Sequence, residues 1–177
     1  MTGPAANSVL EVYMKTYTWT KGEYTVTTDL SKVDLEKAAL LMLEDGWSIH
    51  DRPVDVTISA FENSVTFICL HGEEPVGCVR LVTDFTTVAY AADMIIKKDH
   101  RGKGLSKFVF QCIFEVPVFA KMRRINLQTP DAHGLYAKFG FKPVAHPEEM
   151  MERLSSYEEA YQSFYDNREL IKELRER

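Results

Sequence analysis

The apolar residues in the first half of the chain recur with two different spacings, which predict strands and helices in turn. Residues 24–28 alternate polar and β-branched side chains and predict a first strand. Ser31 or Asp34 is placed to cap a following helix, which Gly46 ends, and a second helix is predicted over residues 54–61. Apolar, β-branched runs then predict three strands, over residues 65–70, 75–82 and 88–96.

The second half of the chain changes to helical spacing at Leu105. Apolar residues every three or four positions predict a helix there, which Pro117 ends or kinks. A strand is predicted over residues 124–129, followed by a helix that Asp131 caps and Gly140 ends. The predicted elements close with a short strand over residues 141–144. This order predicts an α/β (α+β) fold with a mixed, mostly antiparallel central sheet and helices on both faces.

Two terminal segments flank the predicted domain, which spans residues 23–147. Residues 1–22 carry enough apolar side chains, Trp19 among them, to add a strand or to pack on the domain. Residues 148–177 are charged and have a helical pattern with an aromatic stripe. We expect this C-terminal extension either to pack on its own domain or to form a dimer contact.

Composition narrows the class of protein. A chain of 177 residues with 45% hydrophobic and 27% charged residues is typical of one soluble domain. The net charge of −5 argues against a general nucleic-acid binder. Three scattered cysteines predict buried free thiols without a metal site, and no apolar run is long enough to span a membrane. We therefore expect a cytoplasmic monomer or homodimer with no bound metal, nucleic acid or membrane partner.

The positive charge is concentrated between Lys97 and Lys107, where a strand leads through Gly102 and Gly104 into a helix. The first turn of a helix has unpaired backbone N–H groups and a positive dipole end, and glycines let an anion approach the backbone. The segment therefore predicts an anion site, and a pyrophosphate suits it. Neither the Walker spacing nor the dinucleotide-binding Gly-x-Gly-x-x-Gly spacing fits.

Two motifs carry a resemblance to a known family. Residues 101–106, Arg-Gly-Lys-Gly-Leu-Ser, resemble the acyl-CoA loop of the GCN5-related N-acetyltransferase (GNAT) superfamily, with Ser106 departing from its pattern. Residues 126–141 resemble the second GNAT motif, which ends in Tyr-x-x-x-Gly-Phe at Tyr136. Residues 131–136, Asp-Ala-His-Gly-Leu-Tyr, are similar to a branch of small single-domain GNAT proteins. The resemblance covers about residues 26–144.

The resemblance implies a GNAT fold, acetyl-CoA as the acyl donor, and a set of residues that hold it. The loop would bind the pyrophosphate, the strand before it would bind the pantetheine through its backbone, and Thr129 stands where the family often has an asparagine. The implied donor-binding residues are Met94, Ile95, Ile96, Arg101, Gly102, Lys103, Gly104, Leu105, Ser106 and Thr129. Tyr136 matches the family tyrosine that protonates the leaving thiolate, and a phenol stays protonated at neutral pH.

The acceptor side is less defined. In GNAT proteins the region between the first two helices often lines the acceptor pocket, and here it offers Trp47 and His50; His133 is a further candidate for substrate contact. Asp93 lies among small residues and is either a general base, an orienter of water, or a structural carboxylate paired with a cation. The leading hypothesis is an N-acetyltransferase acting on a small-molecule amine. The alternatives are a protein or peptide N-acetyltransferase and a non-catalytic acyl-CoA sensor.

Overall fold

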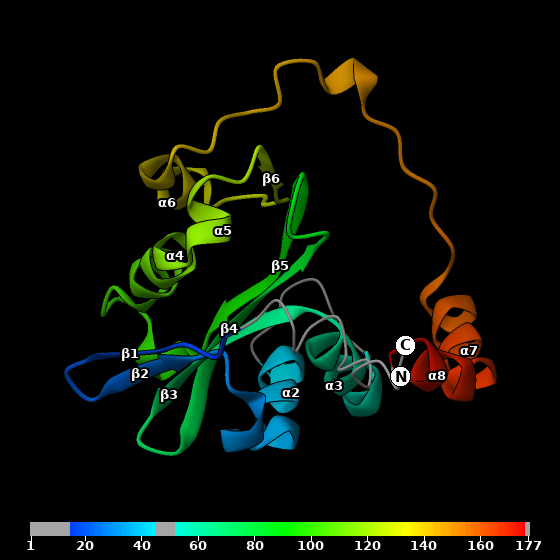
Figure 1. The fold of residues 1–177 in the computed structure, drawn as a ribbon, viewed down its shortest axis with the longest axis horizontal. Helices are drawn as coiled ribbons and strands as arrows, with labels where there is room; N and C mark the ends of the chain where they lie inside the picture. Colours follow the sequence, from blue (N-terminus) through cyan, green and yellow to red (C-terminus); the bar gives the residue numbers. More distant parts are fainter. Residues whose placement is uncertain (1–14, 45–51, 176–177) are drawn as a thin grey trace, which may run out of the picture.

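A six-stranded sheet forms the centre of the molecule in the computed structural model, which describes residues 15–44 and 52–175 (Figure 1). The strands lie in chain order, and every neighbouring pair is antiparallel except the last, which is parallel. The strands are β1 (Thr18–Lys21), β2 (Tyr24–Thr27), β3 (Val65–His71), β4 (Glu74–Thr83), β5 (Val88–Ile96) and β6 (Arg124–Asn126). The mixed, mostly antiparallel α/β fold predicted from the sequence is thereby confirmed.

Helices cover both faces of this sheet (Figure 1). After a short 3-10 turn, η1 (Leu30–Lys32), the helices α2 (Leu35–Glu44) and α3 (Val54–Glu62) enclose a core around Met42, Phe61 and Ile68. The helices α4 (Leu105–Glu115) and α5 (Pro117–Ala120) enclose a larger core on the other face, around Phe67 and Phe110. Pro117 occupies the first position of α5 and separates it from α4, as predicted.

The chain after β6 differs from its prediction. The helix there is short, α6 (His133–Tyr136), and runs into a 3-10 turn, η3 (Ala137–Phe139). Asp131 does not cap it: the N-cap is Ala132, no side chain caps this helix end, and the Ala132 N–H donates to the Thr129 hydroxyl at 3.0 Å. Residues 141–144 form no strand, since the described sheet ends at β6 and no further strand lies beside them.

The C-terminal extension is helical only from Tyr157 onward. A 3-10 turn, η4 (Pro147–Glu149), precedes an irregular stretch, and a capping box between Ser156 and Glu159 then starts α7 (Tyr157–Asp166), followed by α8 (Arg168–Arg175). The segment arches from α6 back to the side of α3 (Figure 1). There the Tyr165 hydroxyl donates to Asp55 Oδ1 at 3.0 Å. Within the described ranges, no helix has the length and apolar character needed to cross a membrane.

Candidate active site

A β-bulge in β5 positions the side chains of the candidate site. Cys78 of β4 pairs with Ile95 but Arg80 pairs with Ala92, so β5 carries one extra residue between these pairs, and Asp93 has a positive φ of 57°. The extra residue reverses the alternation of the strand. Ala91 therefore packs in the core beneath α4 and Ile95 in the core beneath α2, whereas a regular strand would place both on one face.

Beyond the bulge, the outer edge of β5 has no strand beside it in the described part of the chain. The parallel pairing with β6 covers only Val88, Ala89 and Tyr90. On its other edge β5 stays paired to β4 as far as Ile96, and the Lys97 N–H donates to the Val76 carbonyl at 2.8 Å. The predicted pantetheine-binding backbone at Met94 to Ile96 thus lies on a strand with one edge unpaired, which suits an extended ligand.

The loop between β5 and α4 fits an anion. Gly102 and Gly104 both have φ of 76°, a conformation that favours glycine, and a Cβ on either would meet no atom within 4 Å. Gly104 is the N-cap of α4, and no side chain caps this end of the helix. The Arg101 Nε donates to the Ile96 carbonyl at 2.7 Å and fixes the loop to the strand. The loop therefore presents an open, uncapped helix N-terminus to a ligand.

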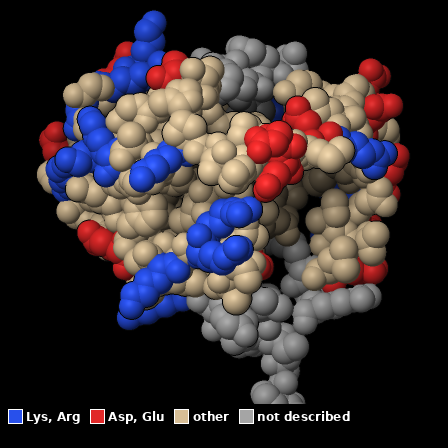
Figure 2. Space-filling view, turned by 90° about the horizontal axis from the view of Figure 1, so that it is seen from above, with Lys and Arg blue, Asp and Glu red and all other residues tan. Residues whose placement is uncertain are grey.

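Cationic side chains flank this helix end. Lys103 Nζ donates to the Tyr24 hydroxyl at 3.3 Å, which links the loop to β2. Lys21 of β1 lies over the Phe108 ring at 5.7 Å, so the first hairpin also brings a positive charge to the first turns of α4. Seen from above, most of the visible Lys and Arg side chains lie on the left and in the centre of the molecule, and a hollow lies between this body and the C-terminal helices on the right (Figure 2).

Tyr136 ends α6 with its ring buried and its hydroxyl accessible. The side chain is 8% exposed and packs edge-on against Phe110 and Phe141. Burial, with a smaller contribution from the Asp131 charge, raises the pKa of the Tyr136 phenol above its usual value. None of the hydrogen bonds between described residues uses the Tyr136 hydroxyl. Since no described side-chain N or O atom is both sealed from solvent and unpaired, the Tyr136 hydroxyl is accessible to a partner. With its pKa raised, the phenol keeps its proton at neutral pH.

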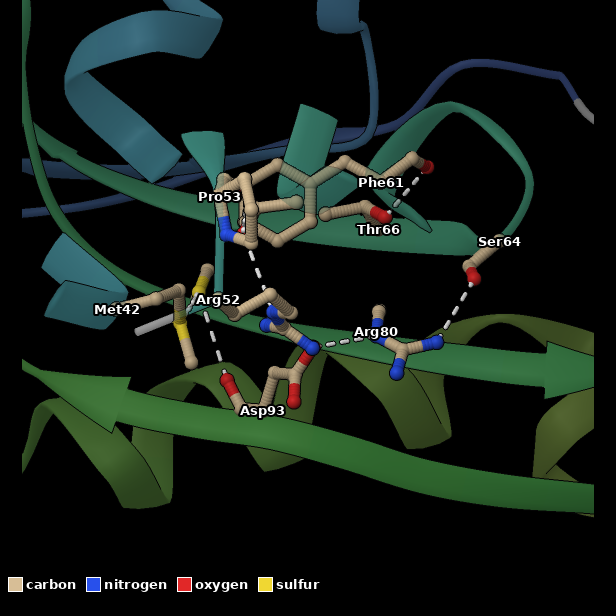
Figure 3. A network of polar contacts seen from close by, with 10 residues as sticks. Met42, Arg52, Pro53, Phe61, Ser64, Thr66, Arg80 and Asp93 are labelled. Carbon is tan, nitrogen blue, oxygen red and sulfur yellow. Dashed lines mark hydrogen bonds and ion pairs between the residues drawn. The ribbon is translucent and has the colours of Figure 1, made fainter. Parts of the chain in front are cut away.

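Asp93 projects from the bulge between two guanidinium groups (Figure 3). Arg52 Nη2, just before α3, donates to Asp93 Oδ2 at 2.9 Å, and Arg80 Nε of β4 donates to the same oxygen. Arg52 is held in turn by Thr57 Oγ1 at 3.1 Å, and Arg80 reaches Ser64 Oγ at 3.4 Å. The structure thus supplies the neighbouring cations that a structural role for Asp93 requires.

Sequence reasoning did not assign a role to Arg80. The feature that could have pointed to Arg80 is its charge, because it interrupts a run of buried residues in β4. Of the other predicted site residues, Thr129 lies in the loop before α6 and His133 is exposed on the first turn of that helix, whereas Trp47 and His50 lie outside the described residues. The predicted buried free thiols are confirmed; they are Cys69, Cys78 and Cys112.

The structure thus combines a mixed sheet, an open helix N-terminus at Gly104 and a buried tyrosine at the end of α6. The family model described as "Acetyltransferase (GNAT) domain" matches residues 62–143. A Gibberella zeae protein named as an acetyltransferase is 31% identical over 145 residues, which cover 70% of this chain and 81% of that protein.

Solved structures agree. A crystal structure of a GNAT-family protein from Xanthomonas campestris is 33% identical, with a TM-score of 0.69 over 75% of this chain and 93% of that one. A Clostridium acetobutylicum structure solved with acetyl-CoA shares the fold at 15% identity, with a TM-score of 0.55 over 74% of this chain and 94% of that one. The chain belongs to the GNAT family of acetyltransferases.

Proposed function

We propose that this acetyltransferase uses acetyl-CoA to acetylate the primary amine of a small molecule by direct attack on the thioester. The observation that carries the proposal is the open helix end at Gly104, which directly follows the unpaired edge of β5. One ligand that combines a pyrophosphate with an extended amide chain would occupy both. The Clostridium acetobutylicum relative in fold, solved with acetyl-CoA, supports this assignment.

The donor-binding residues divide by the part of acetyl-CoA that each would hold. Backbone N–H groups from Gly102 to Ser106 would bind the pyrophosphate, with Arg101 fixing the loop, Lys103 adding charge and Leu105 anchoring the helix in the core. The backbone of Met94, Ile95 and Ile96 would pair with the pantetheine. When bound, acetyl-CoA supplies the thioester carbonyl, and an N–H of this strand would polarise its oxygen. Thr129 offers a hydroxyl hydrogen from the loop before α6.

The transfer step then needs three proton movements. The amine nitrogen attacks the carbonyl carbon, a C–N bond forms, the C–S bond breaks, and the nitrogen loses a proton that restores the Tyr136 phenol. The Tyr136 hydroxyl donates its proton to the departing sulfur, and its raised pKa keeps that proton in place at neutral pH. The amine has a pKa of about 10.4 and arrives protonated, so a base must first accept its proton.

Asp93 suits a role in orienting either the amine or a water molecule that accepts the proton of the amine. Both arginines bond to its Oδ2, and no described contact uses its Oδ1. The ion pairs fix the carboxylate at the bulge, one residue before the pantetheine-binding segment, and leave one oxygen for water or substrate. The exposed His133 remains a candidate for substrate contact, and we place Trp47 and His50 with it on the acceptor side.

The test is thiol release from acetyl-CoA across a panel of primary amines and N-terminal peptides, for the wild type and Tyr136→Phe. Amine-dependent release that falls in the variant while CoA still binds would support the enzyme and its acid. Release with peptides alone would move the acceptor class to proteins. Tight CoA binding with no release on any acceptor would favour a non-catalytic sensor, and no CoA binding would overturn the proposal.

A further inference from the structure

The acceptor side of the bulge holds more positive than negative charge. Two guanidinium groups share the single carboxylate of Asp93, and the three side chains are 11% (Arg52), 17% (Arg80) and 9% (Asp93) exposed. Charges so far removed from water are normally balanced by partners. One carboxylate balances only one of the two cations, so the cluster carries a net positive charge next to the candidate acyl-transfer site.

Both guanidinium groups also keep unused hydrogen-bond donors. A guanidinium has five N–H donors. Arg52 uses Nε and Nη2 in its described contacts, and Arg80 uses Nε and Nη1. Arg52 Nη1 and Arg80 Nη2 are left without a described acceptor, and neither atom is sealed from solvent. The donors are thus accessible to a ligand and lie beside an unused carboxylate oxygen, Asp93 Oδ1.

An apolar surface borders the cluster. Arg80 pairs across the sheet with Ala92, and Val82 pairs with Tyr90, so these side chains share one face of β4 and β5. This is the face that α3 covers, because Arg52, just before that helix, bonds both to Asp93 and to Thr57 within it. Val82 and Tyr90 are 47% and 38% exposed, which leaves the apolar surface beside Arg80 uncovered in the described structure.

From this arrangement we propose that the acceptor is an amine that also carries a carboxylate, such as an α-amino acid with an apolar side chain. The carboxylate would bond to Arg80 and Arg52 through their unused N–H groups, since planar guanidinium and carboxylate groups match in geometry. The ammonium would face Asp93 Oδ1, and the apolar side chain would lie on Val82 and Tyr90. This inference rests on the proposed N-acetyltransferase function and names its substrate class.

The test uses matched acceptors that differ by the carboxylate: phenylalanine against 2-phenylethylamine, and leucine against 3-methylbutylamine. Thiol release from acetyl-CoA gives kcat/KM for each. Arg80→Lys and Arg52→Lys keep the positive charge beside Asp93 but remove the planar guanidinium group and its paired N–H donors. Each is compared with Arg123→Lys, an exposed arginine outside the network. The ratio of kcat/KM within a pair, compared between proteins, cancels the intrinsic reactivity of each amine.

We expect the wild type to prefer the carboxylated member of each pair, and either cluster variant to reduce that preference about tenfold, as the loss of a charged hydrogen bond predicts. Arg123→Lys should leave it unchanged. Either cluster variant suffices if the other does not fold. Equal use of both members by the wild type, or a preference that both variants keep, would overturn the inference and leave the proposed function standing.

A calorimetric titration of phenylalanine into the CoA-loaded protein decides the remaining case, in which acetyl-CoA binds but no amine is acetylated. Saturable binding of phenylalanine that Arg80→Lys weakens would support the carboxylate site although the proposed transfer fails. No binding would overturn the carboxylate site as well.

Discussion

Gly77 of β4 lies directly against Ile96, the last residue of β5. A Cβ on Gly77 would stand 2.5 Å from Ile96 Cδ1 and 2.8 Å from the Ile95 carbonyl oxygen. Gly77→Ala must therefore displace the end of β5, and we expect it to lower stability by about 1–3 kcal/mol, as overpacked cores do. Because this segment is proposed to bind the pantetheine, the KM for acetyl-CoA should also rise. Chemical denaturation and steady-state kinetics measure the two effects.

Gly134→Ala is the matched control for that substitution. Gly134 lies in α6, and a Cβ there would meet nothing within 4 Å. Alanine favours helix by about 1 kcal/mol over glycine, so this variant should keep or gain stability. If Gly77→Ala proved as stable as the wild type and bound acetyl-CoA equally well, the close approach of the two strands would not constrain the site.

Gly104 and Gly140 give a second matched pair. Both have a left-handed backbone, with φ of 76° and 84°, and a Cβ on either would meet nothing within 4 Å. Alanine at either position should cost about 1–2 kcal/mol of stability through backbone strain. Only Gly104→Ala places a methyl group where the pyrophosphate is proposed to bind. We expect it alone to weaken CoA binding, measured by calorimetry; equal losses in both variants would contradict the loop's assignment.

The central part of the fold could be predicted from the sequence because its signals are local. The apolar, β-branched run of β5 defined that strand to the residue, and the glycines and following apolar stripe located α4. The segment 141–144 failed as a strand because a strand needs a partner, and the sequence does not show that the sheet ends at β6. The start of α7 likewise depends less on the helical pattern of the segment than on one residue, Ser156, whose cap sets where the helix begins.

The candidate site was predictable only where its residues are neighbours in the chain. The loop 101–106 and the motif at Tyr136 are continuous, so their spacing could be read directly. Asp93 bonds to residues 41 and 13 positions away, and no local pattern predicts which cations reach it. The bulge also reverses which side chains of β5 face α3. Such an irregularity in strand pairing cannot be recognised from the alternation of residues along the strand.

Asp84 organises the turn that starts β5, and its removal should destabilise the fold. Its Oδ1 accepts the backbone N–H groups of Thr86, Thr87 and Val88 at 2.8–3.1 Å, and these hydrogen bonds, together with one from the Thr87 hydroxyl, hold the pKa of Asp84 well below its usual value. Because the folded protein favours the charged form, this stabilisation is complete above the unfolded value of 3.8 and is lost as pH falls below it.

We therefore expect Asp84→Ala to lower Tm at neutral pH and to flatten the decline of Tm between pH 4 and 2.5. Thermal melts over this range measure both. Asp99→Ala is the control, since Asp99 is exposed and none of the described hydrogen bonds uses it. A variant that melts like the wild type at pH 7 would show that the turn is held by other contacts.

The pH dependence of catalysis tests Tyr136 as the acid. Burial raises the pKa of its phenol above the usual value of 10, so the proton needed by the leaving thiolate is present at all lower pH values. We expect kcat to show no alkaline decline below pH 10 and Tyr136→Phe to reduce kcat about 10²-fold, the lower end of the range for a general acid. The variant should fold normally, because none of the hydrogen bonds between described residues uses the Tyr136 hydroxyl. Tyr17→Phe, a half-buried tyrosine stacked on Trp19, is the control and should keep its kcat. An alkaline decline centred below pH 9 that persists in Tyr136→Phe would assign the proton to another group.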